Sequence, residues 1–188
     1  MRILIIDNYD SFTYNLVQLI RQTTGKEPIV KRNDQITIQE VAAYDKILLS
    51  PGPGIPSEAG LLLEIIKNYA HSKSILGICL GHQAIGEAFG AKLIILKNVF
   101  HGVATRIKLA MDDSLFSGLP QYIEAGRYHS WVVSNSNFPS VLKKIAEDDQ
   151  GNIMAVRHKV YDVTGVQFHP ESILTPSGKT IISNWLNS

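Results

Sequence analysis

Along the first half of the chain, short runs of β-branched apolar residues alternate with segments whose apolar residues recur at helical spacing. The runs that fit buried strands are residues 3–6, 28–31, 46–50 and 74–78. In the segment after the first run, Phe12, Leu16 and Leu19 share one helix face. This rhythm is typical of parallel strands joined by crossover helices. We therefore predict an α/β fold with an open, mostly parallel, twisted sheet and helices on both faces.

The second half follows a different pattern. From residue 92 to residue 168, short strands are separated by turn residues and show little helical period. We expect an antiparallel, β-rich excursion there, followed by a helix that starts near Ser177 and carries Ile181 and Trp185 on one face. No repeat or low-complexity stretch interrupts the chain, so residues 1–188 are predicted to form a single domain.

Composition and charge narrow the functional classes. The 188 residues include 18 Lys and Arg against 17 Asp and Glu, for a net charge of +1. Such a balance gives no electrostatic footprint for nucleic acid or an anionic membrane, so we expect neither partner. The first apolar run is too short for a signal-peptide core or a membrane span. We expect a cytoplasmic protein, or one from which a targeting segment has been removed.

Cys79 is the only cysteine, which excludes an internal disulfide and a multi-cysteine zinc site. It lies in Gly77-Ile78-Cys79-Leu80-Gly81, between a predicted strand and a predicted helix. This is the thiol counterpart of the nucleophile elbow, in which small neighbours permit a strained turn. The adjacent helix N-terminus favours a thiolate over a thiol. Cys79 is therefore a candidate nucleophile, and a buried inert cysteine is the alternative.

A thiolate nucleophile needs a base, and the chain has six histidines. His169 and Glu171 flank a proline that favours extended backbone, which places both side chains on one side. Glu171 can then orient the imidazole as the third member of a triad; a solvated turn is the alternative. His82 is a weaker candidate, because a helix N-terminus disfavours an imidazolium. His101 and His129 have no partner at a ligand spacing, so we predict no metal site.

The loop from Pro51 to Pro56 is a poor phosphate cradle, because its prolines lack N–H groups. A loop with only one or two backbone donors is better suited to binding a single oxyanion than a phosphate group. Together with the amide of Leu80, the amide of Gly54 can hold a tetrahedral oxyanion, each donor contributing about 3 kcal/mol in the transition state. A rigid structural turn is the alternative.

Taken together, these motifs resemble those of class I glutamine amidotransferases. The resemblance extends over almost the whole chain and favours one branch, the small subunits of anthranilate synthase and aminodeoxychorismate synthase. The segments that carry it are residues 7–15, 50–54, 77–84, 127–130 and 165–172.

The resemblance implies a Cys-His-Glu triad that hydrolyses L-glutamine to glutamate and ammonia. Cys79 would attack the side-chain amide, and His169, oriented by Glu171, would protonate the departing ammonia and then activate water against the γ-glutamyl thioester. The resemblance also implies substrate contacts, from Gly52, Pro53, Gly54, Gln83 and the backbone around Ser130 and Trp131.

The same resemblance implies a partner. Ammonia would pass along a shielded path to a larger, chorismate-binding synthase subunit in a heterodimer or heterotetramer. No cofactor is expected in this chain, and Mg²⁺ is expected in the partner. Gly54 favours the anthranilate branch, whereas residues 31–34 and 152–158 fit folate-branch or dual-use subunits equally well. A thiol sensor without catalysis and a free-standing hydrolase are two further hypotheses.

Overall fold

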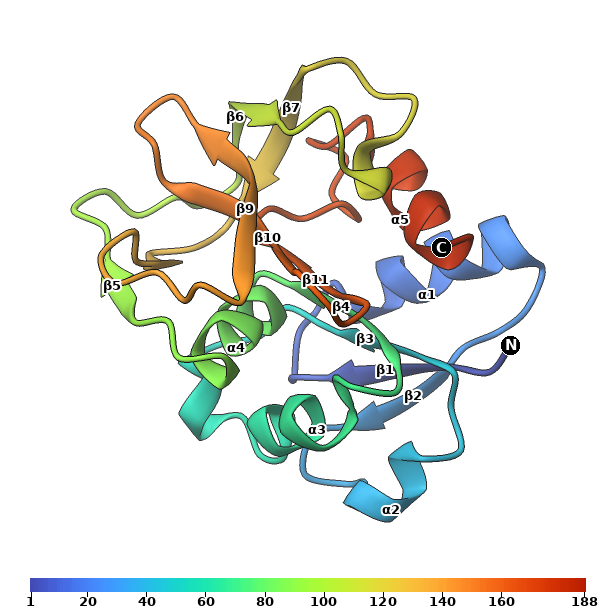
Figure 1. Ribbon diagram of the computed structural model, residues 1–188. Coiled ribbons are helices and arrows are strands. Elements are labelled where there is room, and N and C mark those ends of the chain that lie inside the picture. Colours follow the sequence, from blue (N-terminus) through green and yellow to red (C-terminus); the bar gives the residue numbers. More distant parts are fainter.

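A mixed sheet runs through the protein, and helices cover both of its faces (Figure 1). The computed structural model describes residues 1–188. Its strands are β1 (Ile3–Asp7), β2 (Ile29–Arg32), β3 (Lys46–Leu49), β4 (Ser74–Ile78), β5 (Leu93–Ile95), β6 (Val103–Leu109), β7 (Tyr122–Arg127), β8 (Trp131–Val133), β9 (Leu142–Asp148), β10 (Ile153–His158) and β11 (Val163–Val166). Its helices are α1 (Thr13–Thr24), α2 (Ile38–Val41), α3 (Leu62–Tyr69), α4 (Leu80–Ala88) and α5 (Gly178–Leu186), with short 3-10 turns η1 (Pro56–Glu58) and η2 (Ser114–Phe116).

The main sheet has nine strands in the order β2-β1-β3-β4-β11-β10-β9-β6-β7. The five strands from β2 to β11 are parallel, and every later pair is antiparallel. The predicted α/β fold is therefore confirmed. The antiparallel strands of the second half extend the main sheet, whereas the sequence predicted an excursion from it. Strand β11 then returns to pair in parallel with β4. Strands β5 and β8 form a separate two-stranded ribbon.

Alternation along the central strands divides the core into two layers. In β1, Ile3 and Ile5 belong to the cluster under α1 and α5, whereas Leu4 and Ile6 belong to the cluster under α2, α3 and α4. Figure 1 shows these two helix groups on opposite sides of the parallel strands. A sheet buried on both faces requires nearly continuous apolar strands, which is the pattern that the sequence shows.

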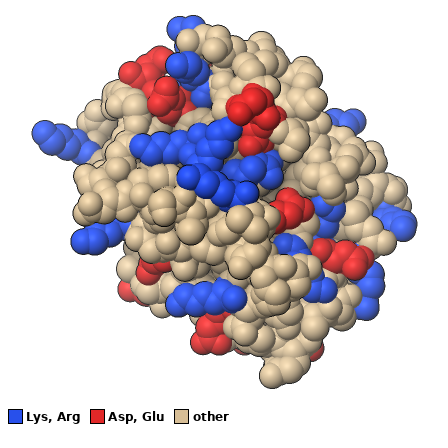
Figure 2. Space-filling model, in the orientation of Figure 1, with Lys and Arg blue, Asp and Glu red and all other residues tan.

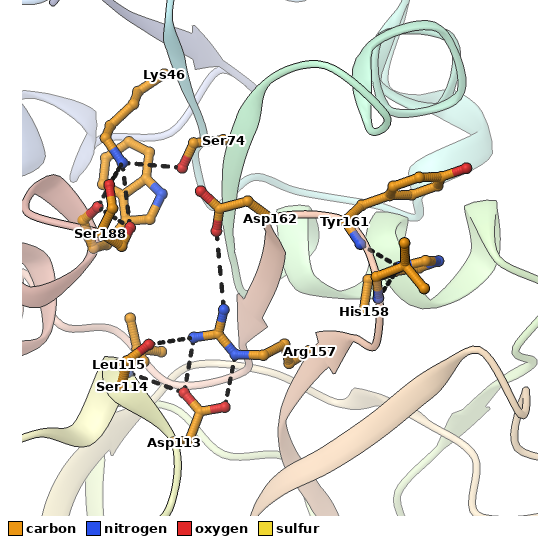
Figure 3. A network of polar contacts seen from close by, with 12 residues as sticks. Lys46, Ser74, Asp113, Ser114, Leu115, Arg157, His158, Tyr161, Asp162 and Ser188 are labelled. Carbon is orange, nitrogen blue, oxygen red and sulfur yellow. Dashed lines mark hydrogen bonds and ion pairs between the residues drawn. The ribbon is translucent and has the colours of Figure 1, made fainter.

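Polar contacts close the end of the sheet where β3 and β4 begin (Figure 3). The buried ammonium of Lys46 donates to the Ser74 hydroxyl at 3.1 Å and to the Trp185 carbonyl at 2.8 Å. Nearby, Arg157 on β10 makes a two-pronged contact of 2.6 and 2.8 Å with Asp113. These contacts fasten α5 and η2 to the sheet, at the end opposite to the carboxyl ends of the parallel strands.

Exposed charges are mixed in sign. Figure 2 shows basic side chains gathered over the region where β9 and β10 lie in Figure 1, with acidic side chains beside them. Among the exposed ion pairs, Lys143 pairs with Asp112 at 2.7 Å, and Lys108 pairs with Glu147 at 3.6 Å. Because each of these two cations has an acidic neighbour, neither adds to an extended field of one sign.

We predict that two neighbouring aspartates contribute unequally to stability. The Asp113 side chain is 3% exposed, holds Arg157 and caps η2 through the Leu115 amide at 3.0 Å. Asp113→Ala should lower the free energy of unfolding by about 2–4 kcal/mol, because it removes a cap and leaves the partly buried Arg157 guanidinium with only the more distant Asp162 carboxylate, at 3.9 Å. Urea unfolding at neutral pH measures the change.

Asp112 is the matched control. Its contact with Lys143 is equally short, but its side chain is 72% exposed, so Asp112→Ala should leave the unfolding midpoint unchanged. Equal destabilisation by the two substitutions would show that burial does not determine the strength of these pairs.

Candidate active site

Cys79 occupies the single position between β4 and α4. Its backbone is strained, with φ 51° and ψ −99°, in a region that L-residues rarely adopt. The turn is possible because of its neighbours: a Cβ added at Gly77 would overlap the backbone of Gly81. The structure thus has the sharp strand-to-helix turn that the Gly-x-Cys-x-Gly motif predicts.

Strand pairing brings His169 to this turn. In the parallel pair of β11 and β4, Val166 lies opposite Ile78, and the Cys79 amide donates to the Val166 carbonyl at 2.9 Å. His169 lies three residues after the end of β11, so it emerges at the same edge of the sheet. Its Nδ1 lies 2.6 Å from Glu171 Oε1, with both side chains buried. His169 also interacts with the Cys79 side chain, which contributes to its charge state, while Nε2 is buried and has no hydrogen-bond partner.

The charge state of His169 follows from these contacts. Burial disfavours the charged ring, but the interaction with the Cys79 sulfur, followed by that with Glu171, outweighs it and raises the pKa of His169 to about 10. The ring of Tyr128 packs against the imidazole edge-on, with centroids 4.8 Å apart, and shields it from water. The arrangement therefore holds a proton on the imidazole at neutral pH, which suits a general acid beside a sulfur nucleophile.

A cavity of about 260 Å³ opens in front of Cys79. All six residues predicted to contact substrate line it: Gly52, Pro53, Gly54, Gln83, Ser130 and Trp131. Further lining residues, which the prediction did not include, are Val99, Phe100, His101, Tyr128 and His129. A larger hollow of about 570 Å³ lies along α1, but its lining contains no nucleophile. The cavity at Cys79 is therefore the one that combines a reactive atom with room for a small molecule.

Two backbone N–H groups beside Cys79 are free to bind an anion. The amide of Gly54 donates to no protein acceptor, and its φ of 75° requires glycine. Leu80 is the first residue of α4, where an amide has no acceptor within the helix. Gly52 lets the loop approach closely, because a Cβ there would lie 2.5 Å from the Asn8 carbonyl. These free donors suit a developing oxyanion.

The rival base His82 is placed differently. It is completely buried on α4, and its ring packs against Gly165, where an added Cβ would lie 2.9 Å from Nδ1. Burial lowers the pKa of His82 to about 4, so the ring is neutral and a weak base. His82 therefore fills space between α4 and β11.

A buried polar line behind the cavity is the part of the site that sequence reasoning missed. Arg127 forms an ion pair with Asp148 at 2.8 Å and donates from Nε to His129 Nε2 at 3.0 Å. Burial and the nearby Arg127 charge lower the pKa of His129 to about 3, which keeps its ring neutral. Gln83 and Gln167 continue the line towards Cys79. In the sequence, Gln83, Arg127 and Gln167 each lie in one of the quoted motifs, but nothing there reveals that they join in one buried line.

We predict that removing either Cys79 or Glu171, the two interaction partners of His169, lowers the pKa of His169. Glu171→Gln and Cys79→Ala each remove an interaction that favours the charged ring, and the remaining burial favours the neutral form. NMR titration of the His169 ring protons should therefore show a midpoint well below 10 in both variants. His129 should remain neutral throughout, since Arg127 is unchanged. A His169 midpoint near 10 in both variants would contradict the assigned cause.

Comparison with known proteins identifies the family of this chain. Residues 4–188 match the family described as "Glutamine amidotransferase class-I". The chain is 48% identical over 189 residues to anthranilate synthase component 2 of Thermus thermophilus, covering 99% of this chain and 92% of that protein. It is 45% identical over 188 residues to the aminodeoxychorismate/anthranilate synthase component 2 of Bacillus subtilis, covering 99% and 96%.

A solved structure extends the comparison to the fold. The crystal structure of a Thermoplasma acidophilum protein, described as a subunit of GMP synthase, superposes with a TM-score of 0.88 and 28% identity, covering 100% of this chain and 92% of that one. The family match over nearly the whole chain, the relatives and this superposition lead to one conclusion: the chain belongs to the class I glutamine amidotransferase family.

Proposed function

We propose that this protein is the glutaminase subunit of a chorismate-aminating synthase, acting as anthranilate synthase component 2. The observation that carries the proposal is that Cys79, which lines a cavity of about 260 Å³, interacts with His169, whose Nδ1 lies 2.6 Å from Glu171 Oε1. The names of the relatives support the synthase assignment. The Bacillus subtilis relative carries both synthase names, so service to the folate branch, alone or in addition, is the second candidate.

The reaction proceeds in two steps. The Cys79 sulfur attacks the side-chain amide carbon of L-glutamine, while the amides of Gly54 and Leu80 bind the oxyanion. His169 gives its proton to the amide nitrogen, the C–N bond breaks, and ammonia leaves a γ-glutamyl thioester. The neutral His169 then takes a proton from water, whose oxygen displaces the sulfur. Glutamate departs, and the thiolate and the imidazolium are restored.

The orientation of Gln83 fits a role in binding glutamine. Its Nε2 already donates to the Trp131 carbonyl at 2.9 Å and to Gln167 at 3.3 Å, so its Oε1 is left to accept from an N–H of the substrate. The loop of Gly52 and Pro53 and the backbone of Ser130 and Trp131 form the facing walls of the cavity. An acceptor at this point selects for a substrate that carries a donor.

Exposed apolar residues beside the cavity fit a partner subunit. Val99 lines the cavity and is 70% exposed. Ile173 is 95% exposed and follows Ser172, whose hydroxyl lies 3.2 Å from that of the cavity residue Tyr128. Apolar side chains at a site that releases ammonia are suited to be covered by the chorismate-binding subunit, in a heterodimer or heterotetramer. Mg²⁺ is assigned to that partner, and L-glutamine is the ligand of this chain.

Two further observations describe the chain alone. No group of three or more His, Cys, Asp and Glu side chains is arranged to hold a metal ion. None of the helices combines the length and the apolar character that crossing a membrane requires. Location in the cytoplasm is part of this proposal.

Cys79→Ala tests the proposed reaction. In the complex with the synthase subunit, glutamine-dependent amination of chorismate should fall at least about a thousandfold, because the nucleophile is lost. Amination with ammonium salts should continue, because that step belongs to the partner. Product formation from each nitrogen source, followed by chromatography, gives the two rates, and Asp112→Ala should keep both.

The remaining outcomes separate the competing hypotheses. Glutamine-dependent amination by Cys79→Ala would refute the nucleophile assignment. Full glutaminase turnover by the unmodified chain without a partner would favour a free-standing hydrolase. Absence of glutaminase activity even with the synthase subunit present would favour a sensor.

Ile173→Lys tests the partner surface. A charge placed on a covered apolar position should weaken the binding of the synthase partner by about tenfold or more, because the charge must be desolvated in the complex. Isothermal titration calorimetry measures the change. Val160→Lys is the control: Val160 is 81% exposed, but it lies between β10 and β11, at the opposite end of the sheet. Equal effects of the two substitutions would place the partner elsewhere.

A further inference from the structure

A second side chain besides His169 reaches the sulfur of Cys79. Gln167 is completely buried, and its Nε2 lies 3.6 Å from Cys79 Sγ. We propose that the Gln167 side-chain amide donates a hydrogen bond that stabilises Cys79 as a thiolate and fixes the position of its sulfur. The inference deepens the proposed function and rests on the role of Cys79 as its nucleophile.

Backbone hydrogen bonds explain why the Gln167 side chain lies next to the Cys79 sulfur. The Val166 carbonyl accepts from the amide of Cys79, so the next residue, Gln167, lies beside the sulfur. The backbone N–H of Gln167 donates to the Met154 carbonyl at 2.8 Å, which ties this segment to β10 as well. Phe168 belongs to the apolar core. The backbone is thus held on two sides, and the Gln167 side chain has little freedom to leave the sulfur.

The direction of the amide is determined by its neighbours. The Trp131 carbonyl can only accept, so the Gln83 group that faces it at 2.9 Å is the NH₂ group. The same nitrogen lies 3.3 Å from Gln167 Oε1 and supplies its second hydrogen there. With the oxygen of Gln167 occupied as an acceptor, its NH₂ group is the one that faces Cys79. A flipped amide would place two donors against each other, and an acceptor against the thiolate.

The line of hydrogen bonds begins at Arg127, whose guanidinium can only donate. A guanidinium has no acceptor, so Arg127 Nε donates to His129 Nε2, and the proton of this neutral ring resides on Nδ1. Nδ1 donates to the Trp131 carbonyl at 3.0 Å, which therefore accepts from both His129 and Gln83. Asp148 holds Arg127 in place at 2.8 Å. A buried ion pair thus fixes every donor and acceptor as far as the sulfur.

The chemical consequence concerns the anion. An N–H donor stabilises a negatively charged sulfur more strongly than a neutral one, since hydrogen bonds to charged groups are the stronger kind. Burial of Gln167 means that no water can take its place. His169 must give its proton to ammonia during the reaction, whereas the Gln167 donor remains throughout. Gln167 therefore donates to the thiolate before it attacks glutamine, and again when hydrolysis of the thioester releases the sulfur.

Alkylation of Cys79 by iodoacetamide across pH tests the proposal on the full chain. Since the chain has one cysteine, the reagent reports on this sulfur alone. Gln167→Met keeps a similar volume without a donor, and should slow alkylation at neutral pH about tenfold and move the midpoint of the profile up by about one pH unit. Gln167→Glu, which places a carboxylate at the sulfur, should shift the profile further in the same direction.

The controls separate this effect from loss of packing. Asn184→Leu removes a side-chain amide that donates to Leu115 and Ser117, away from the site, and should leave the profile unchanged. Profiles of both Gln167 variants that coincide with that of the unmodified chain would overturn the proposal. A measurement without substitution covers the case of a variant that does not fold: the Gln167 side-chain NH₂ signals should shift when the Cys79 thiolate is protonated, and fixed signals would also overturn it.

This test is independent of the proposed function. Alkylation needs neither glutamine nor the synthase subunit, so a profile that does not respond to Gln167 leaves the glutaminase assignment intact. Conversely, if the complex had no glutaminase activity, a shifted pH profile of alkylation in the Gln167 variants would still support the hydrogen bond between Gln167 and Cys79.

Discussion

The parallel pairing of β4 with β11 is the constraint on which the site depends. The two strands come from distant parts of the sequence, yet their register places Val166 beside Ile78. The segments that follow the two strands therefore leave the sheet at the same level. Cys79 and Gln167 are the next residues along, and His169 follows. A slip of one residue would turn the alternating side chains to the opposite face and separate the sulfur from the imidazole. Continuous apolar packing on both faces of the sheet holds that register.

Close backbone approach is the second requirement, and it explains where glycine is found. Gly77, Gly81 and Gly52 have no room for a Cβ, because each lies against backbone of a neighbouring segment. Together they let the elbow, the loop after β3 and the loop after β1 converge at Cys79. The cost is backbone strain at Cys79, a residue other than glycine that adopts a positive φ. Such strain persists only where the surrounding structure determines the geometry, and here the three segments do so.

Local patterns in the sequence predicted much of this architecture, and the missing part was of a particular kind. Alternating apolar runs predicted the parallel strands, and the elbow and the His169 to Glu171 spacing predicted which residues meet. The pattern did not separate β11 from the antiparallel strands before it, because pairing partners are not encoded in a single strand. Nor did it predict Arg127, Asp148 and Gln167 as one buried line. Each looks like an ordinary surface residue until the fold removes water from around it.

The central place of β11 also has a consequence for synthesis on the ribosome. Cys79 and the whole of β4 emerge from the exit tunnel well before the segment that contains His169. Until then the sheet has an open edge at β4, and the sulfur has neither its acid nor its amide donor. Insertion of β11 between β4 and β10 closes that edge through contacts of long sequence separation, which form late in folding. Cys79 therefore meets His169 and Gln167 only when the sheet is completed.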